Sequence, residues 1–222
     1  NLKEYWDIME KYPQSMGAYV WDFVDQGIRQ VTEDGVMWYA YGGDFGDKPN
    51  LRNFCINGLV GPDREIHPGC WELKKVHQPV KVHAIDVIAG IFEVENKYDF
   101  ISTEHLKIKW ELRANGVAVQ KGEVPPMKIM PTEKKELKLT YQQDSNKKNA
   151  EYMLFIGFYL LNDEKWYVDG HVIAWDQFEI PYPKGEPETK SLDQLPAIEI
   201  TESKKTLDIS GKDFKYSINR KK

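Results

Sequence analysis

The sequence predicts a mainly β chain with an immunoglobulin-like β-sandwich in its middle, preceded by an α/β segment and followed by the start of a further β domain. Three observations predict this arrangement. A helical pattern and a continuous apolar run lie within residues 1–78, alternating strand patterns fill 79–182, and a stretch rich in Pro, Lys and Glu precedes a last group of strand patterns. We therefore expect three domains, at 1–78, 79–182 and 183–222, which a length of 222 residues can accommodate if they are small or incomplete.

The first segment is predicted to be a helix followed by a buried strand. One helical face carries four apolar side chains, Leu2, Tyr5, Trp6 and Met9. Pro13 follows where the helix should stop. The nearly continuous apolar run at 17–24 is typical of a strand buried on both faces, as in a parallel sheet. Helix followed by buried strand is the order expected of an α/β domain.

A long polar loop and a second helix complete this segment. A polar stretch at 33–35 leads into a loop of about 25 residues that is dense in Gly, Asp and Asn, and loops this long in a compact domain are usually functional. Pro68 suits the first position of a helix, which we expect to run to about Gln78.

From residue 80 onward the pattern changes to alternation. Apolar and charged residues alternate over 106–113, so one face of this strand is buried and the other is solvated. Asn115 and Gly116 supply the pair with positive φ that a type I′ hairpin turn needs, and Val117 and Val119 mark the return strand.

Other short strands complete the predicted sandwich. They are expected at 82–87, 92–98, 137–141, 152–161 and 172–180. Such a series in about 100 residues is typical of an immunoglobulin-like sandwich, here without an inter-sheet disulfide. Residues 182–196 are expected to be a linker. The strand-like runs beyond it, at 198–201, 206–209 and 214–218, would bury too little to be stable alone, which indicates the opening of a further domain.

Composition excludes several classes of partner. The 35 acidic and 30 basic residues are spread along the chain without a basic stripe, so we expect no nucleic-acid partner. No apolar run approaches the roughly 20 residues that span a bilayer, so we expect no membrane partner. Cys55 and Cys70 match neither a zinc spacing nor a redox pair and are expected to be free thiols. Seven Trp and twelve Tyr are more than packing alone suggests, and such an excess is common where sugars stack.

Four aspartates are candidate acids: Asp22, Asp25, Asp44 and Asp47. Retaining glycoside hydrolysis needs two carboxyl groups roughly 5 to 5.5 Å apart, a separation that a sequence does not reveal for any pair. Aspartates in Gly-rich turns more often hydrogen-bond the turn, which is our preferred interpretation. The segment also lacks the ligand pattern of an EF-hand. Three histidines, His67, His77 and His171, are expected to be structural.

Trp21, Phe54 and Asn57 are the candidate binding residues. If the predicted strand ends at Val20, the Trp21 side chain projects at the end where barrel enzymes build their sites, so its ring can face a sugar or pack in the core. The carbonyl of Phe54 and the side-chain oxygen of Asn57 can share a hard cation, whereas an Asn in a loop can equally cap a turn. The residues alone leave these alternatives open.

Several blocks of the sequence carry a more specific signal. They are 21–26, 41–47, 53–60, 63–64, 67–68, 122–125, 171–177, 201–203 and 211–214, together with Asn50. In content, order and spacing these blocks closely resemble the lactose-cleaving β-galactosidases of glycoside hydrolase family 2, and the resemblance covers essentially the whole chain.

The resemblance implies a domain assignment and an activity. Residues 1–78 are then the C-terminal portion of a (β/α)8 (TIM) barrel, 79–182 the immunoglobulin-like domain that follows it, and 183–222 the linker and first strands of a β-supersandwich domain. The implied activity is retaining hydrolysis of terminal non-reducing β-D-galactose residues in β-galactosides. In that family the two catalytic glutamates lie on earlier barrel strands, so no catalytic residue is assigned here, and we expect this chain alone to be inactive.

The resemblance also assigns binding roles. Trp21 matches a wall of the galactose subsite, while Phe54, through its carbonyl, and Asn57, through its side chain, match ligands of a sodium ion that touches the sugar. The magnesium ligands would lie upstream, so we expect neither Na⁺ nor Mg²⁺ to bind well to this chain alone. We expect the parent enzyme to be a homo-oligomer, in the cytoplasm or the periplasm.

Two alternatives to this function remain. The first is another family-2 specificity, such as that of a glucuronidase or a mannosidase, because a fold does not fix its substrate. The second is a non-catalytic β-sandwich module that binds carbohydrate or protein.

Overall fold

The computed structural model describes residues 2–142, 147, 149–162, 170–183, 185, 191, 193 and 195–220. The chain forms two compact units, Asn1–Tyr182 and Pro183–Lys222. The predicted linker at 182–196 lies largely outside the described residues, and the three-domain division stays a prediction. No helix in the described part of the chain is both long and apolar enough to cross a membrane.

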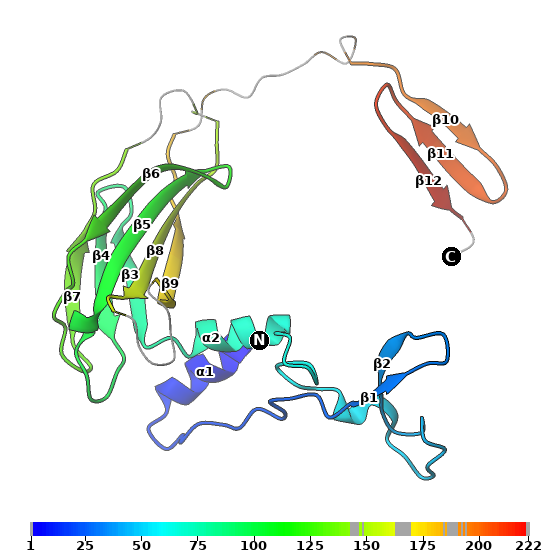
Figure 1. Cartoon of the computed structure of the whole chain (residues 1–222). Helices are drawn as coiled ribbons and strands as arrows, with labels where there is room; N and C mark the ends of the chain where they lie inside the picture. Colours follow the sequence, from blue (N-terminus) through cyan, green and yellow to red (C-terminus); the bar gives the residue numbers. More distant parts are fainter. Residues whose placement is uncertain are drawn as a thin grey trace. The chain divides into compact units, whose positions relative to one another are not determined.

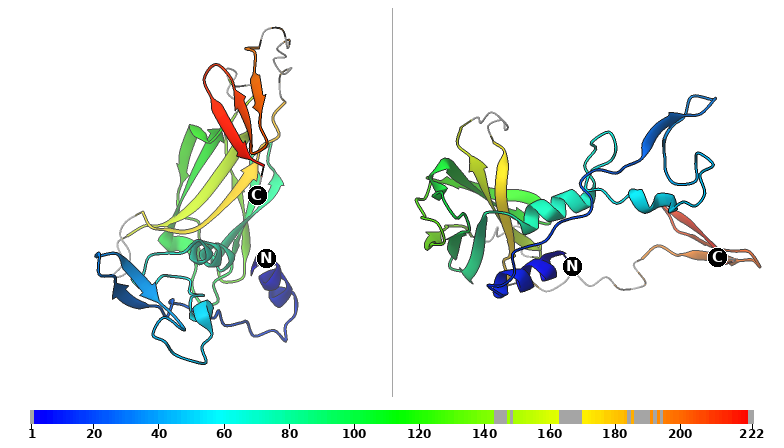
Figure 2. Two further views of the ribbon diagram at one scale, coloured as in Figure 1. Left: turned by 90° about the vertical axis from the view of Figure 1, so that its right-hand side faces the viewer. Right: turned by 90° about the horizontal axis from the view of Figure 1, so that it is seen from below.

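The first unit begins with two helices and the segment between them (Figures 1 and 2). Helix α1 (Leu2–Lys11) contacts helix α2 (Pro68–Val76). Between them lie strands β1 (Ile28–Val31) and β2 (Met37–Ala40) and a short 3₁₀ helix, η1 (Arg52–Cys55). Helix α2 begins at Pro68 as predicted, and α1 ends before Pro13 as predicted.

The strand predicted at 17–24 is wrong. These residues form no strand, and only Val24 makes an isolated parallel bridge, to Val60. Tyr19 is fully exposed and Val20 is 44% exposed. A strand buried on both faces needs neighbours on both sides and cover on both faces. Among the described residues this run has only the loop around Val60 beside it, so its apolar side chains face solvent.

The polar stretch at 33–35, which was predicted to lead into a long loop, is the turn of a β-hairpin. Strands β1 and β2 pair antiparallel with Ile28 opposite Ala40. The hydroxyl of Thr32 accepts a hydrogen bond from the Val36 amide at 2.9 Å, and Gly35 takes a φ of +84°. Such a Gly at positive φ between two strands is a known hairpin signal.

The sandwich consists of two antiparallel sheets (Figure 1). One sheet has the order β3-β4-β7, from strands β3 (Val80–Asp86), β4 (Ile91–Asn96) and β7 (Lys134–Lys138). The other has the order β6-β5-β8-β9, from β5 (Leu106–Ala114), β6 (Val117–Val124), β8 (Tyr152–Leu160) and β9 (Val172–Glu179). A short 3₁₀ helix, η2 (Thr103–His105), precedes β5. The prediction of a mainly β, sandwich-like fold is confirmed.

The hairpin of β5 and β6 forms as predicted. Asn115 and Gly116 have φ values of 50° and 80°, and the Asn115 side-chain oxygen accepts a hydrogen bond from the Glu151 amide at 2.9 Å. Along β5, buried residues alternate strictly with half-buried ones. The buried residues join those of the other strands in one core, whose largest fully buried side chains include Phe92, Tyr152 and Phe158.

Strand β7 lies three residues earlier than predicted. The prediction placed it at 137–141, but it pairs with β4 over Lys134–Lys138. Leu137 is the buried residue of this strand, and Lys134 forms an ion pair with Glu93 of β4 at 2.9 Å. Most of β7 is therefore polar, and apolar alternation alone finds only its last residues.

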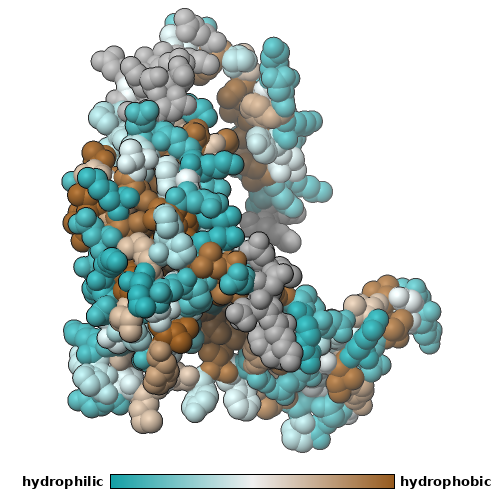
Figure 3. Space-filling model, turned by 60° about the vertical axis from the view of Figure 1, so that its left-hand side comes forward, coloured by the Kyte–Doolittle hydropathy of each residue, from teal (hydrophilic) through white to brown (hydrophobic). Residues whose placement is uncertain are grey.

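The second unit contains one antiparallel sheet. Its order is β10-β11-β12, from β10 (Glu199–Glu202), β11 (Thr206–Ser210) and β12 (Lys215–Asn219), close to the predicted runs. None of residues 195–220 is buried. Figure 3 shows hydrophilic and hydrophobic side chains interspersed over one face of the molecule.

Candidate functional site

Two of the sequence blocks lie side by side and form the candidate site. We call residues 21–26 the Trp21 segment and residues 41–61 the site loop. Backbone hydrogen bonds join them: the Asp22 amide donates to the Asn57 carbonyl at 3.3 Å, and the Leu59 amide donates to the Asp22 carbonyl at 3.1 Å. Further along, the Asp25 amide donates to the Val60 carbonyl at 2.9 Å. The chain therefore brings Trp21 and Asn57 close together through the backbone on either side of them.

Asp25 anchors the site loop. Its side chain is buried, and its Oδ1 accepts a hydrogen bond from the Gly58 amide at 2.6 Å. A Cβ atom on Gly58 would lie only 2.3 Å from the Asp25 nitrogen, so the two backbones approach as closely as only glycine allows. His67 donates from Nδ1 to the Gly58 carbonyl at 3.0 Å, and its Nε2 lies 3.8 Å from Asp25 Oδ2. Asp25 is thus a structural anchor, and His67 holds the same point of the loop.

The other three candidate acids hold turns. Asp22 accepts hydrogen bonds from the Phe23 amide at 2.5 Å and from the Gln26 side chain at 2.6 Å. Asp44 accepts from the Tyr41 amide at 2.7 Å, and Asp47 accepts from the Gly43 amide at 2.9 Å. The structure thus shows these aspartates bonded within their own turns.

A tyrosine ties the hairpin to the residues that directly follow the site loop. The Tyr39 hydroxyl on β2 donates to the carboxylate of Asp63. This hydrogen bond, together with the negative charge, raises the pKa of Tyr39 to about 12. The phenol therefore stays protonated at physiological pH and keeps its donor role.

The three predicted binding residues all face solvent. Trp21 is 75% exposed and Phe54 is 66% exposed, and Asn57 is also exposed. Within this chain Trp21 is therefore not a core residue, and its ring is open to a ligand. Phe54 and Asn57 thus both lie at the surface of the site loop.

The donors suit one cation better than another. The described residues contain no group of three or more His, Cys, Asp or Glu side chains that could hold a metal ion. A carbonyl from Phe54 and an amide oxygen from Asn57 are hard, neutral donors, which fits Na⁺ in kind but supplies only part of a coordination shell. Mg²⁺ is usually held through carboxylates, and the aspartates of this loop are engaged in its turns.

Two residues that shape the site had no such role in the predictions from sequence. Asp25 was predicted only as a candidate acid, and Gly58 was given no role. A signal was present, because Gly58 directly follows Asn57 in a loop where the chain returns to the Trp21 segment. The closeness of the two backbones at that point depends on tertiary structure, which no local pattern reveals.

Comparison with known families gives two matches along the chain. The model described as "Glycosyl hydrolases family 2, TIM barrel domain" matches residues 1–82, and "Beta-galactosidase, domain 4" matches residues 92–181. The two matches cover the helical segment with the candidate site and nearly all of the sandwich.

Curated relatives match over most of the chain. The β-galactosidase of Priestia megaterium is 34% identical over 223 residues, which cover 100% of this chain and 21% of the relative. Those of Aeromonas hydrophila and Photobacterium profundum are 35% and 37% identical over 183 residues, covering 82% and 81% of this chain and 18% of each relative. The chain thus spans about a fifth of the length of the curated relatives it matches.

Proposed function

Because the chain belongs to the β-galactosidases of glycoside hydrolase family 2, we propose that it forms part of an enzyme that releases terminal non-reducing β-D-galactose from β-galactosides with retention of configuration. The observation that carries the proposal is the arrangement at the candidate site. An exposed Trp21 lies next to Asn57, and backbone hydrogen bonds fix the two segments against each other.

In this proposal Trp21 is a wall of the galactose subsite. An indole ring is large, flat and apolar, and it can cover the carbon-bound hydrogens of a sugar ring while the polar edge stays solvated. Asn57 supplies an amide group for the sugar or for a cation that contacts it. When bound, a sodium ion would add a positive charge at the polar edge of the sugar, with Phe54 and Asn57 among its ligands.

We further propose that the catalytic carboxyl groups come from elsewhere in the enzyme. A retaining reaction needs a nucleophile and a general acid. The aspartates of this site accept hydrogen bonds that hold the site loop and the Trp21 segment, so each of them already has a structural role. This chain alone is therefore expected to show no turnover.

The first test is an assay with nitrophenyl β-galactoside. The complete enzyme should hydrolyse it, and the isolated chain should release no more nitrophenol than a mock preparation. Turnover by the isolated chain would contradict the proposed division of labour. Hydrolysis of the glucuronide or mannoside by the complete enzyme, without hydrolysis of the galactoside, would favour the sibling specificity.

The second test addresses the role of Trp21. In the complete enzyme, Trp21→Ala should raise KM for the galactoside by roughly 5- to 150-fold, because a stacking surface of this size is worth about 1 to 3 kcal/mol. Trp71→Ala is the matched control, since Trp71 is a 53% exposed tryptophan on α2. An equal effect of both substitutions on KM would contradict the proposal that Trp21 is a wall of the galactose subsite.

The rival reading of a binding module has its own test. A glycan array probed with the isolated chain should show almost no affinity if the chain is one wall of a larger subsite. Retained affinity for a specific glycan would favour a carbohydrate-binding module instead.

A further inference from the structure

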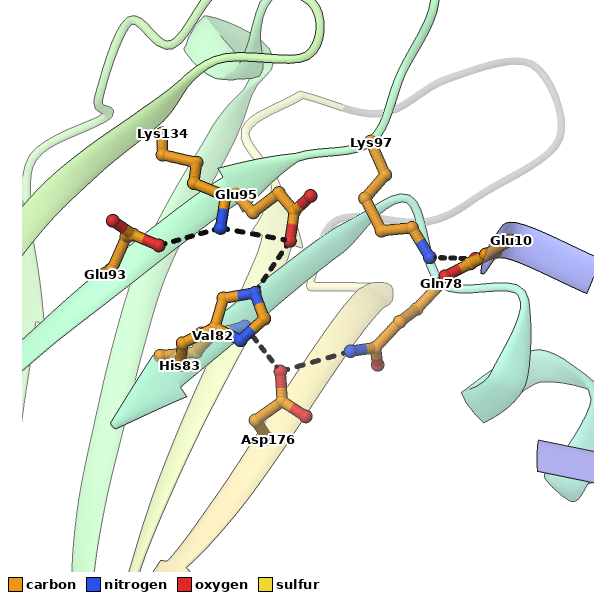
Figure 4. A network of polar contacts seen from close by, with 9 residues as sticks. All are labelled: Glu10, Gln78, Val82, His83, Glu93, Glu95, Lys97, Lys134 and Asp176. Atoms are coloured by element: carbon orange, nitrogen blue, oxygen red, sulfur yellow. Dashed lines mark hydrogen bonds and ion pairs between the residues drawn. The ribbon is translucent and has the colours of Figure 1, made fainter. Parts of the chain in front are cut away.

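The sequence block 171–177 has no part in the candidate site, yet the structure gives it a clear contact. It begins at His171, leads into β9 and faces the C-terminal half of α2. Asp176 of β9 accepts three hydrogen bonds: from Lys75 Nζ at 2.6 Å, from Gln78 Nε2 at 3.1 Å and from the Val82 amide at 2.8 Å. Figure 4 shows Asp176 reached by Gln78 and by the backbone of β3. One carboxylate thus joins the helix end and two strands.

The groups around Asp176 form a closed network, which we call the Asp176 joint: Lys75, Gln78, Trp175 and Asp176. Gln78 is buried, and its side-chain oxygen accepts from Lys75 at 3.1 Å and from the Trp175 amide at 3.2 Å. Lys75 also donates to the Trp175 carbonyl, and its ammonium group lies 5.3 Å from the centre of the Trp175 ring. Because Lys75, Gln78 and Asp176 each bind the other two, and Lys75 and Gln78 also bind the backbone of Trp175, the network fixes both position and orientation.

Further contacts hold the helices at the same place. Lys74 of α2 lies 3.2 Å from His171 Nε2, and Lys97, which follows β4, pairs with Glu10 of α1. The ring of Trp6 on α1 lies 4.0 Å from that of His77. The end of α2 is therefore held by the sandwich on one side and by α1 on the other.

The opposite end of α2 reaches the candidate site. His67 is the residue before the first turn of α2, its amide donates to the Leu59 carbonyl at 3.1 Å, and its ring binds the Gly58 carbonyl. The nine residues of α2 span about 14 Å at 1.5 Å per residue. One short, stiff helix thus has the Asp176 joint at its end and the anchor of the site loop at its start.

We infer that the Asp176 joint positions the sugar-facing loop, with α2 as the rigid connection. The sandwich then acts as a fixed base for the galactose subsite, and Asp176 is a positioning residue. The inference rests on the proposed function for its consequence on sugar binding. If α2 shifts, Gly58 and His67 shift with it, and Trp21 and Asn57 lose their place opposite the sugar.

Asp176→Asn is the sharpest way to loosen the joint. The amide keeps one oxygen acceptor but removes the charge that holds Lys75. The new NH₂ group of the asparagine would also lie against another donor, either the Lys75 ammonium or the Gln78 amide, because both of these groups donate to Asp176 in the wild type. The Lys75 ammonium, which is 34% exposed, is left without its ion-pair partner.

Glu95→Gln is the matched control. Glu95 lies in β4 of the same unit, accepts a hydrogen bond from His83 at 2.6 Å and lies 4.0 Å from the Lys134 ammonium (Figure 4). The substitution also removes one half-buried carboxylate with a basic partner, but its contacts with His83 of β3 and Lys134 of β7 both lie within the sandwich. Both variants lose one negative charge, so net charge does not distinguish them.

The experiment compares both variants with the wild type in the complete enzyme. Hydrogen exchange of the amides at 58–60 reports on the site loop directly, while KM and kcat for nitrophenyl β-galactoside report on sugar binding, and thermal unfolding reports on stability. Asp176→Asn should speed exchange at 58–60 and raise KM by roughly three- to tenfold with a smaller change in kcat, since small displacements of positioning groups cost up to about 10²-fold. Glu95→Gln should change thermal unfolding alone.

The two readouts separate the inference from the proposed function. If the wild-type enzyme does not cleave the galactoside, the proposed function fails, and the exchange data still decide whether the joint holds the loop. Wild-type exchange at 58–60 in Asp176→Asn overturns the inference whatever the kinetics. So does an equal effect of Asp176→Asn and Glu95→Gln on exchange and KM.

A second variant guards against a folding defect. If Asp176→Asn does not yield folded enzyme, Lys75→Met leaves the bonds of Asp176 to Gln78 and the Val82 amide in place while it removes the ammonium. It should give the same changes in exchange and KM, to a smaller extent. Wild-type exchange at 58–60 together with a wild-type KM in Lys75→Met would overturn the inference.

Discussion

The sandwich and the site loop belong to one compact unit but keep their shapes by different means. In the sandwich, apolar side chains from two sheets bury one another in a single core. Among residues 2–66, Ala40 and Val60 are the buried apolar side chains, and the loop is held by its hydrogen bonds with the Asp25 carboxylate, the His67 ring and neighbouring backbone. Stability and ligand contact are thus divided between regions: the core supplies the first, and an exposed, polar-anchored loop supplies the second.

The largest effect is expected in the sandwich core. Phe92 is fully buried, and its ring lies 5.1 Å from that of Phe178. Phe92→Ala should lower the free energy of unfolding by about 3 to 5 kcal/mol, because it removes a large side chain and leaves a cavity. Urea unfolding measures the change, with Phe100→Ala as the control, since Phe100 is 93% exposed. Similar losses of unfolding free energy in Phe92→Ala and Phe100→Ala would mean that the sandwich core is not the main source of stability.

Gly58→Ala should break the loop with a smaller effect. Its Cβ would lie 2.3 Å from the Asp25 nitrogen and 2.7 Å from the Val60 carbonyl oxygen, so backbone must move. We expect a loss of about 1 to 3 kcal/mol in urea unfolding and faster proteolysis near the loop. In Gly69→Ala the new Cβ would have its nearest neighbour, Leu59, at 3.7 Å, so this helical control should be neutral or stabilising. Equal behaviour of the two variants would contradict the close approach at Gly58.

Acid should weaken the contact between the helices and the sandwich. Burial, and then the charge of Lys97, lowers the pKa of His77, while burial and Lys74 lower the pKa of His171. The unfolded chain therefore binds protons more readily than the folded chain. The stability that the two neutral histidines contribute is fully present above their ordinary pKa of 6.5, and it is lost as pH falls through their lowered pKa values in the folded chain.

The loss should be below about 1 kcal/mol, because solvent screens both rings. Urea unfolding at pH 7.5 and at pH 5.5 measures it, and His171→Gln together with His77→Gln should flatten the difference. An unchanged pH dependence in the double variant would assign the effect to other groups.

The smallest effect on stability is expected at the site itself. Trp21 is 75% exposed, so Trp21→Ala should change the free energy of unfolding by no more than about 0.5 kcal/mol. Thermal unfolding of the isolated chain measures this. A large loss would show that Trp21 supports the fold, and the contrast between core and loop would disappear.

The same contrast explains what could be predicted from the sequence. Strands β5 and β6 find their partners within the chain, so alternation in β5 and the turn at Asn115 and Gly116 were sufficient to predict this hairpin. The run at 17–24 is as apolar as a buried strand, but pairing and cover decide whether such a run becomes one. An apolar run becomes a buried strand only where other parts of the structure pair with it and cover it, and its hydrophobicity alone does not show whether they do.

At the candidate site, local chemistry was predictable and tertiary contacts were not. Aspartates in Gly-rich turns were expected to bind the turns, and Asp44 and Asp47 do so. The burial of Asp25 and its bond to Gly58 join residues 33 positions apart, which no spacing rule covers. The roles of Trp21, Phe54 and Asn57 came from family resemblance and stay predictions.

The sheet of the second unit has a practical consequence. In the described structure β10 and β12 each pair with β11 on one side, which leaves a row of backbone donors and acceptors along the other. Such margins are templates for another copy of the chain. Charged residues lie along them, Glu199 and Glu202 on β10 and Lys215 on β12, and repulsion between like charges weakens as ionic strength rises. Raising the salt concentration should therefore ease the pairing of two β10 edges, or of two β12 edges, between purified molecules.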